Sequence, residues 1–334
     1  MQAFQLRRAD TADFAIRSAS GAKTAQQGAD IRFLAGGTTL LDLMKLNVET
    51  PQQIIDINHL PLDKIEPIQG GGLLIGATVR NSDLANDENV KRDYPVLSQA
   101  LLAGASAQLR NMATTGGNLL QRTRCVYFRD TDMACNKRTP GSGCAAIGGF
   151  NRNLAILGVS DQCIATNPSD MNVALMALDA TIHIKGAQGE RAVPISEFFL
   201  LPGNTPDKET IVQPGDLITH VSLPAPAQGA RSLYLKLRDR ASYEFALASA
   251  AVVMTVNGDT IDKVAFAMGG VGVRPWRNKE AEEALNGRAP GRDAFNNAAE
   301  IFLQDAQPQS SNAFKVELAR RCLVHTLDAA SKLA

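Results

Sequence analysis

Apolar residues follow two different spacings in the first sixty residues of the chain. They recur at helical spacing in Thr11–Ala25 and Leu40–Leu46, and they form short runs in Ile31–Ala35 and Gln53–Ile57. Helical spacing predicts amphipathic helices, whereas short apolar runs bounded by turn residues predict buried strands. The order helix, strand, helix, strand therefore predicts a small α/β unit over residues 1–59.

The same patterns predict two further units. In residues 60–225, strands and helices are expected at Gly70–Val79, from Ser82 onward, and at Val96–Leu102, Met171–Leu178, Ala180–Lys185 and Leu217–Leu223. In residues 230–334, strands are expected at Ser249–Asn257 and Val264–Met268, and helices at Ala281–Leu285, Ala294–Leu303 and Ala313–Leu333. Between them, Pro224–Gly229 (PAPAQG) has the composition of a linker.

One long segment of the second unit lacks a clear period. From Arg122 to Gln162 the chain is rich in Gly, Arg and Asp and holds most of the cysteines. A loop of that length inside a compact domain is uncommon and is usually functional or disordered. We therefore predict an inserted loop at about 122–165.

The composition restricts the possible functions. Of 334 residues, 45% are hydrophobic and 20% are charged, as in ordinary soluble globular proteins. Lys plus Arg and Asp plus Glu number 34 each, so no net charge favours nucleic acid or an acidic membrane. No apolar run reaches the ~20 residues that span a bilayer, and the first residues do not resemble a secretory signal. We expect a soluble protein with no nucleic-acid partner and no membrane span.

Two glycine-rich segments are candidates for binding a diphosphate. IRFLAGGTTL (Ile31–Leu40) places two glycines and two threonines where a strand leads into a helix. Glycines allow successive N–H groups to point into one concavity, although such a turn alone is often purely structural. Gly104–Ser106 and Leu109–Leu119 (LRNMATTGGNL) add hydroxyl and amide groups. Two such segments favour an extended dinucleotide over a single phosphate.

These motifs carry a resemblance to a known family. LAGGTTLL, IGATV and RNMATTGGNL, followed by NPSDMNVALMALDA, resemble the FAD-binding medium subunits of the xanthine dehydrogenase and aldehyde oxidase (molybdenum hydroxylase) family. The resemblance covers essentially the whole chain. It implies an α+β chain with the vanillyl-alcohol-oxidase-like (PCMH-type) FAD-binding fold, made of two α/β subdomains, followed by a C-terminal domain with an antiparallel sheet and helices.

The resemblance also implies a set of FAD-binding residues. Those expected around the pyrophosphate are Ala35, Gly36, Gly37, Thr38, Thr39 and Leu40. Those expected along the flavin and the diphosphate are Ala113, Thr114, Gly117 and Asn118. Ala77 and Ser106 are also expected there, on a looser match to the family motif. Asp170 is expected to bind ribityl hydroxyls, although a carboxylate at a helix N-terminus is its ordinary alternative. Lys236 is expected as the basic residue near the flavin ring.

Four of the five cysteines fall within forty residues of one another. Cys125, Cys135, Cys144 and Cys163 are separated by nine, eight and eighteen residues, while Cys322 lies in a predicted helix. Disulfides are seldom needed in a chain of this length, and structural zinc usually shows close Cys-x-x-Cys pairs. A [4Fe-4S] cluster needs four thiolates on a wrapping loop and tolerates looser spacing. The spacing favours the cluster and leaves zinc, disulfides and free thiols open.

Within the family, the chain looks closest to the periplasmic aldehyde oxidoreductase subunits, which, like 4-hydroxybenzoyl-CoA reductases, carry an extra [4Fe-4S] cluster. The resemblance implies FAD and that cluster as cofactors, and a heterotrimer with a large molybdenum-cofactor subunit and a small [2Fe-2S] subunit. Electrons would pass through FAD to an external acceptor, in the periplasm after export with a signal-bearing partner, or else in the cytoplasm. The four histidines form no catalytic pattern, so no catalytic residue is expected. The alternatives are the medium subunit of an enzyme of the hydroxybenzoyl-CoA reductase or xanthine dehydrogenase type, a zinc-loop assembly protein and a stand-alone flavin oxidase.

Overall fold

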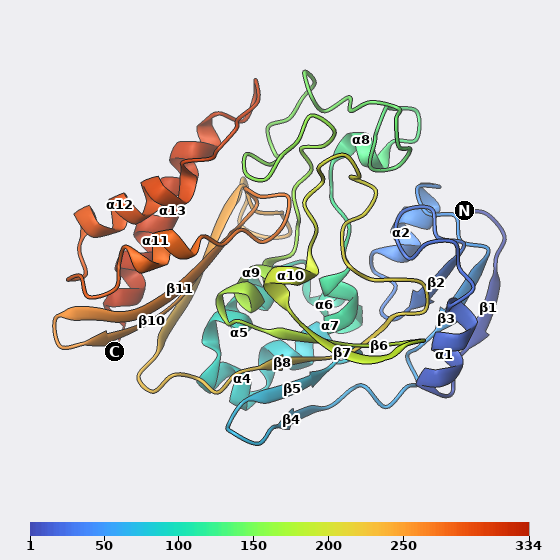
Figure 1. The fold of residues 1–334 in the computed structure, drawn as a ribbon, viewed down its shortest axis with the longest axis horizontal. Coiled ribbons are helices and arrows are strands. Elements are labelled where there is room, and N and C mark those ends of the chain that lie inside the picture. Colours follow the sequence, from blue (N-terminus) through green and yellow to red (C-terminus); the bar gives the residue numbers. More distant parts are fainter. Residues whose placement is uncertain (334) are drawn as a thin grey trace.

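The N-terminal part of the chain forms a small parallel sheet. The computed structural model describes residues 1–333, and in it β1 (Gln5–Arg8), β3 (Gln53–Asp56) and β2 (Ile31–Leu34) lie side by side in that order. Helices α1 (Ala12–Ala19) and α2 (Leu40–Lys45) connect the strands (Figure 1). Since the strands are parallel, the turn after β2 and the loop after β3 emerge at the same edge of this sheet.

A five-stranded antiparallel sheet forms the middle of the molecule. Its order is β4-β5-β8-β6-β7, so β5 pairs with β8 although about 140 residues separate them. Its strands are β4 (Ile65–Pro67), β5 (Leu73–Gly76), β6 (Thr181–Gly186), β7 (Gly189–Pro194) and β8 (Leu217–Leu223). The helices of this region are α3 (Asn81–Asn86), α4 (Glu88–Asp93), α5 (Pro95–Ala103), α6 (Ala107–Met112), α7 (Thr115–Leu119), α8 (Val126–Arg129), α9 (Asp170–Ala177) and α10 (Ile195–Phe198).

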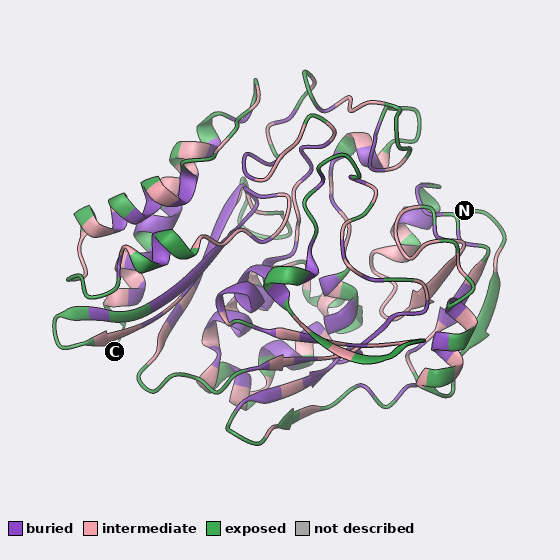
Figure 2. Cartoon of the chain, viewed as in Figure 1, coloured by how far each residue is buried: buried purple, intermediate pink, exposed green. Residues whose placement is uncertain are grey.

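The C-terminal part is an antiparallel sheet covered by helices. Its strands β9 (Arg231–Leu237), β10 (Ala248–Asn257) and β11 (Thr260–Gly269) pair in the order β11-β10-β9. Helices α11 (Lys279–Glu283), α12 (Arg292–Leu303) and α13 (Phe314–Ser331) accompany them. The buried residues of α12 and α13 face this sheet, and the exposed ones face outward (Figure 2). The predicted α+β class, with a C-terminal antiparallel sheet and helices, is confirmed.

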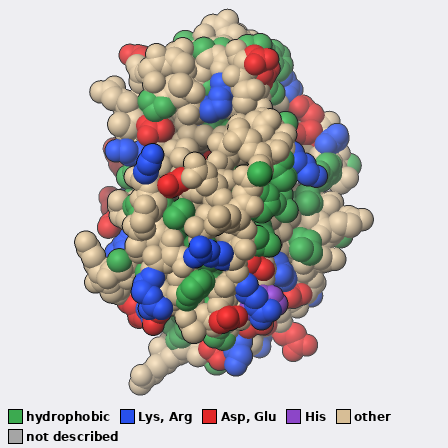
Figure 3. Space-filling view, turned by 90° about the vertical axis from the view of Figure 1, so that its right-hand side faces the viewer, with side chains coloured by type: hydrophobic (Ala, Val, Ile, Leu, Met, Phe, Trp, Pro, Cys, Tyr) green, Lys and Arg blue, Asp and Glu red, His purple; other side chains and the backbone are tan. Residues whose placement is uncertain are grey.

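The surface agrees with the balanced composition. On the side of the molecule that carries the small parallel sheet, basic and acidic side chains are interspersed rather than gathered by sign (Figure 3). Within residues 1–333, no helix has both the length and the apolar character needed to cross a bilayer.

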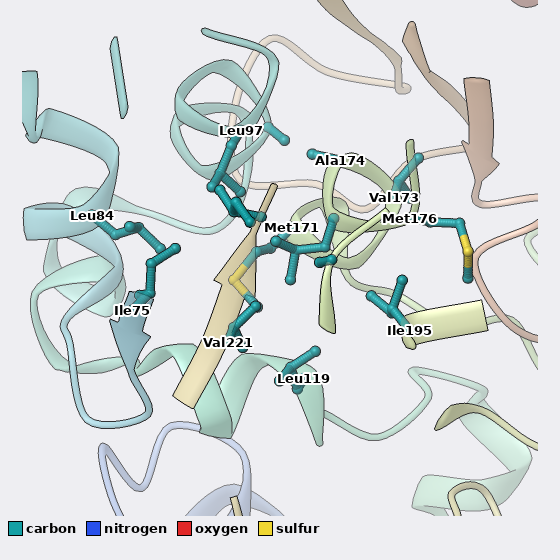
Figure 4. Close-up of a cluster of buried hydrophobic side chains, with 14 of the residues drawn as sticks. Ile75, Leu84, Leu97, Leu119, Met171, Val173, Ala174, Met176, Ile195 and Val221 are labelled. Carbon is teal, nitrogen blue, oxygen red and sulfur yellow. The ribbon is translucent and has the colours of Figure 1, made fainter. Parts of the chain in front are cut away.

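Helix α9 lies at the centre of the largest apolar core. All eight of its residues are buried, which explains why its sequence shows no polar face. Figure 4 shows Met171, Val173 and Met176 of this helix among side chains that come from α3, α5, α7, α10 and the five-stranded sheet. Because the core fixes α9 on every side, it also fixes the position of Asp170 at the N-terminus of the helix.

The predicted insertion is irregular but folded. Between α8 and α9 the structure contains turns and isolated bridges, one of them pairing Cys135 with Cys144, but no helix or strand. The insertion nevertheless has its own small core, which combines cysteines with apolar residues from α2 and its vicinity. Its buried members are Leu43, Val48, Cys125, Phe128, Cys135, Ala146, Leu154, Cys163, Ile164 and Ala165.

Several sequence-based assignments were wrong in detail. Helix α1 ends at Ala19 rather than Ala25, because the following residues include Gly21 and Gly28, the latter at φ +76°. The glycine-rich run Arg110–Asn118, for which no helix was predicted, contains the end of α6 and most of α7. Strand β1 was missed because none of its residues is buried, so it has no alternating pattern.

A buried lysine joins the insertion to the C-terminal part. Lys315 on α13 is fully buried and donates from Nζ to the carbonyl oxygens of Leu154, at 2.8 Å, and Gly270. Asn312 donates to Leu154 as well. Burial, with a smaller contribution from Arg152, lowers the pKa of Lys315 from its usual 10.5 to about 7. Near neutral pH, the Lys315 amine of the unfolded chain therefore binds its proton more tightly than the Lys315 amine of the folded chain.

We predict a pH-dependent stability difference between the wild type and Lys315→Met. Because the folded-state pKa is depressed, the wild type gains stability relative to the variant as the pH rises from about 7 toward 10.5. The gain should approach about 1.4 kcal/mol per pH unit at most. Urea unfolding of both proteins at several pH values measures it, and a difference that does not change with pH would contradict the assignment.

Candidate functional site

The turn between β2 and α2 lies directly against a second segment of the chain. Gly37 has φ +73°, in the left-handed region that glycine adopts without strain. A Cβ atom placed on Gly36 would lie 1.9 Å from the carbonyl oxygen of Met112. No other residue fits there without displacing the backbone. The turn Ala35–Thr38 is thus held in contact with the residues that lead from α6 into α7.

The second glycine-rich segment is organised around the start of α7. The hydroxyl of Thr114 accepts a hydrogen bond from the backbone N–H of Gly117 at 3.2 Å and so caps this short helix. The N–H of Gly116 donates to the carbonyl oxygen of Ala77 at 2.8 Å. A Cβ on Gly116 would lie only 3.1 Å from the Cβ of Ala77. Glycine therefore allows α7 to approach the end of β5 closely.

Two cavities open on either side of this contact. The first has a volume of about 200 Å³ and apolar walls that include Ile31, Phe33 and Ile218. The second, of about 730 Å³, extends toward Asp170 and α9. Thr38, Thr39 and Gly117 line both cavities, so the two adjoin at the glycine-rich turns. Together these adjoining cavities form the candidate site, called the elongated cavity below.

The structure brings most of the predicted FAD-binding residues to these cavities. Those lining the first are Ala35, Gly36, Gly37, Thr38, Thr39, Leu40, Ala77, Thr114 and Gly117. Those lining the second are Thr38, Thr39, Ala113, Gly117, Asn118 and Asp170. Two predicted residues, Ser106 and Lys236, line neither cavity. Ser106 instead caps α6, accepting from the N–H of Leu109 at 3.3 Å.

Asp170 is held by two residues of β9. Tyr234 donates from its hydroxyl to Oδ1 of Asp170 at 2.5 Å, and Lys236 donates from Nζ to Oδ2 at 2.8 Å. Burial first, and then the neighbouring carboxylate, raise the pKa of Tyr234 well above its usual value, so Tyr234 remains a donor. Asp170 both occupies the first turn of α9 and lines the second cavity. Lys236 does not line the cavity itself and acts on it by holding the side chain of Asp170.

Sequence reasoning missed Tyr234 and the apolar wall of the first cavity. Tyr234 and Lys236 are two residues apart on a strand, so they point to the same face, and this spacing was the available signal. The wall residues Val212–Ile218 follow a turn-rich stretch that gave no indication of a site.

The four clustered cysteines surround one small cavity. Cys125, Cys135, Cys144 and Cys163 all line it, together with Phe128 and Lys137. Cys144 is half-buried and the other three are buried, and all four are free thiols rather than disulfides. Cys322 lies elsewhere, buried in α13. The fold of the insertion therefore brings together four sulfur atoms whose residues lie far apart in the sequence.

The four cysteines are not drawn together as metal ligands in this structure. Within residues 1–333, no group of three or more His, Cys, Asp or Glu side chains is placed to hold a metal ion. Burial raises the pKa of Cys125 to about 12. Burial also raises the pKa of Cys163, against the opposing effect of the nearby Lys137 charge. Without a bound cation, these two groups are neutral thiols near pH 7.

Comparison with known proteins agrees with this architecture. The chain is 50% identical over 328 residues to the aldehyde oxidoreductase FAD-binding subunit PaoB of Escherichia coli K12, covering 98% of each chain. It is 29% identical to the glyceraldehyde dehydrogenase medium chain of Sulfolobus acidocaldarius, covering 84% of this chain and 82% of that one. In structure it resembles a chain of the CO dehydrogenase from Oligotropha carboxidovorans, with TM-score 0.79 and 22% identity over 100% of this chain and 99% of that one.

Two family matches together span nearly the whole chain. Residues 8–226 match the FAD binding domain in molybdopterin dehydrogenase, and residues 233–330 match the CO dehydrogenase flavoprotein C-terminal domain. The resemblance stated from the glycine-rich motifs is thereby confirmed. The chain belongs to the family of FAD-binding flavoprotein subunits of molybdopterin-containing dehydrogenases.

Proposed function

We propose that this chain is the FAD-binding electron-transfer subunit of a molybdenum-dependent aldehyde oxidoreductase. The observation that carries the proposal is the 50% identity over 98% of both chains to a subunit of that name, when relatives named for xanthine or CO dehydrogenases share 24–26%. The absence of a nucleophile–base pattern in the sequence agrees with a subunit that moves electrons rather than one that transforms the organic substrate.

The elongated cavity fits one FAD molecule. The apolar walls at Ile31, Phe33 and Ile218 suit the adenosine part, and the backbone N–H groups of the two glycine-rich turns suit the pyrophosphate. The larger second cavity suits the ribityl chain and the flavin ring, with Asp170 as the acceptor for ribityl hydroxyls. The flavin supplies the electron-transfer chemistry, and the protein supplies its position and its environment.

A [4Fe-4S] cluster is the proposed occupant of the cysteine cavity. Four free thiols around one cavity fit the four-thiolate requirement of such a cluster, and the wide spacing of the cysteines differs from the close Cys-x-x-Cys pairs usual for structural zinc. Lys137, which lines the same cavity, would offset the negative charge of thiolates.

The proposed assembly is a heterotrimer with a large molybdenum-cofactor subunit and a small [2Fe-2S] subunit. Relatives are named medium chains or complex subunits, which supports partner chains. The insertion exposes Val126, Met133 and Phe150, apolar side chains that a partner surface can cover. Electrons would leave FAD for an external acceptor. The proposed location is the periplasm, reached through a partner that carries the export signal, with the cytoplasm as the alternative.

Substitution where the two glycine-rich turns meet should weaken FAD binding. We expect Gly36→Ala to weaken FAD binding about 10- to 100-fold, because forcing a methyl group into a closed contact costs about 1–3 kcal/mol. Flavin fluorescence titration measures the affinity. Gly21→Ala is the matched control, since its added Cβ meets no atom within 4 Å. A folded Gly36→Ala protein with wild-type affinity would refute the placement of the pyrophosphate.

Loss of one cavity cysteine should remove iron but not flavin. We expect Cys135→Ser to lose most of its iron and the broad iron–sulfur absorption while keeping the flavin absorption. Cys322→Ser, the buried cysteine outside the cavity, should keep both. Metal analysis and visible spectra measure these outcomes. Wild-type protein with zinc in place of iron, and without flavin, would instead favour a zinc-loop assembly protein.

The isolated chain should not oxidise aldehydes. If the molybdenum site lies on a partner, purified chain loaded with FAD shows no turnover with an aldehyde and oxygen, whereas the complex purified with its partners does. Steady-state assays of both preparations test this, and the co-purifying chains and their cell fraction identify the partners and the compartment. Turnover by the isolated chain would indicate a stand-alone flavin oxidase.

A further inference from the structure

A chain of five charged residues, of which Glu49 and Lys137 are buried and the others half-buried, connects the FAD cavity to the cysteine cavity. Glu49 accepts hydrogen bonds from Arg32 Nη2 at 2.9 Å and from Arg122 Nη1 at 2.6 Å. Glu209 contacts Nε of Arg122 on one side and Nζ of Lys137, at 3.0 Å, on the other. The sequence of contacts is therefore Arg32, Glu49, Arg122, Glu209, Lys137.

The two ends of this network belong to different cavities. Arg32, Glu49 and Arg122 line the first FAD cavity, and Lys137 lines the cysteine cavity beside Cys163. A small third cavity of about 90 Å³ lies between them and is lined by Arg122, Glu209, Lys137 and Cys163. No other group bridges Arg122 and Lys137 among the ion pairs of residues 1–333, so Glu209 is the link.

The network is buried enough for its charges to act on one another. The exposed fraction of the side chain is 2% for Glu49, 8% for Lys137, 13% for Arg122, 19% for Arg32 and 26% for Glu209. Three cations face two carboxylates, so the network carries one excess positive charge. Although burial would raise it, Arg122 and Lys137 hold the pKa of Glu209 below its usual value, so Glu209 is ionised. Charges in such surroundings are screened far less than at the surface.

We propose that Glu209 is a positioning residue that couples the two cavities, so that FAD binding and occupation of the cysteine cavity each strengthen the other. This inference rests on the proposed function. An occupant of the cysteine cavity holds Lys137 in place, and a dinucleotide in the first FAD cavity holds Arg122 in place. Because Glu209 contacts both side chains, ordering one of them leaves less to order at the other. By thermodynamic linkage, the effect is the same in both directions.

The coupling can be measured without relying on activity. Cys144 is the only half-buried thiol of the four, so its alkylation by iodoacetamide reports access to the cysteine cavity. In iron-free wild-type protein, we expect saturating FAD to slow this reaction about tenfold, within the range of typical couplings between sites. In Glu209→Gln, FAD should no longer slow it, because the link between Arg122 and Lys137 is broken.

A matched control lies on the same loop. Asp207→Asn makes the same carboxylate-to-amide change two residues away, at a side chain that forms no ion pair within residues 1–333, and it should behave as the wild type. If Glu209→Gln fails to fold, Lys137→Gln removes the other partner of the link and should give the same loss. Glu209→Asp, which keeps the charge, should restore at least part of the FAD effect.

The outcomes separate this inference from the proposed function. Wild-type protein that binds FAD, but whose Cys144 reacts at the same rate with and without FAD, overturns the coupling and leaves the flavoprotein function intact. The same holds if Glu209→Gln retains the full wild-type FAD effect. Wild-type protein that binds no FAD overturns both. Loss of the FAD effect in Glu209→Gln, but not in Asp207→Asn, supports the coupling.

Discussion

The contact between Gly36 and the carbonyl oxygen of Met112 determines where the site lies. At that contact a single added carbon would overlap a backbone oxygen, so the small parallel sheet and the helix pair α6–α7 meet backbone to backbone. Residues of both glycine-rich turns consequently line the two adjoining cavities of the site. A dinucleotide needs apolar volume at both ends and polar contacts in the middle, and this contact produces that arrangement.

Helix α2 connects the glycine-rich turn to the core of the insertion. Its first residues follow the glycine turn, whereas Leu43 on its other side is buried in the core that contains the cysteines. Asp42 of the same helix binds Arg124 and Arg129, and the bond from Arg129 holds the pKa of Asp42 below its usual value. The insertion is thus built against an element of the FAD-binding site, which gives a segment of few helices and strands a defined position.

Local chemistry explains what the sequence could predict. The glycine-rich turns, the α+β class and the clustering of cysteines follow from residues close together in the chain, so motif and period were sufficient. Short elements such as α7, and the exposed strand β1, depend on tertiary contacts that leave little pattern. The ionic network from Arg32 to Lys137 could not be predicted from the sequence for the same reason. Arg122 and Glu209 are 87 residues apart, and each alone resembles a surface charge.

The case of Lys236 shows why a residue type near a motif does not define its role. A basic residue was expected beside the flavin ring, but the Lys236 side chain is 4% exposed and satisfies Asp170 and the carbonyl oxygen of Ala103. A buried carboxylate without a cation is costly, so Asp170 can face the second cavity only because β9 supplies that cation and the hydroxyl of Tyr234. The C-terminal sheet therefore contributes to the site by fixing one carboxylate, and the two parts of the chain that match separate family descriptions depend on each other through it.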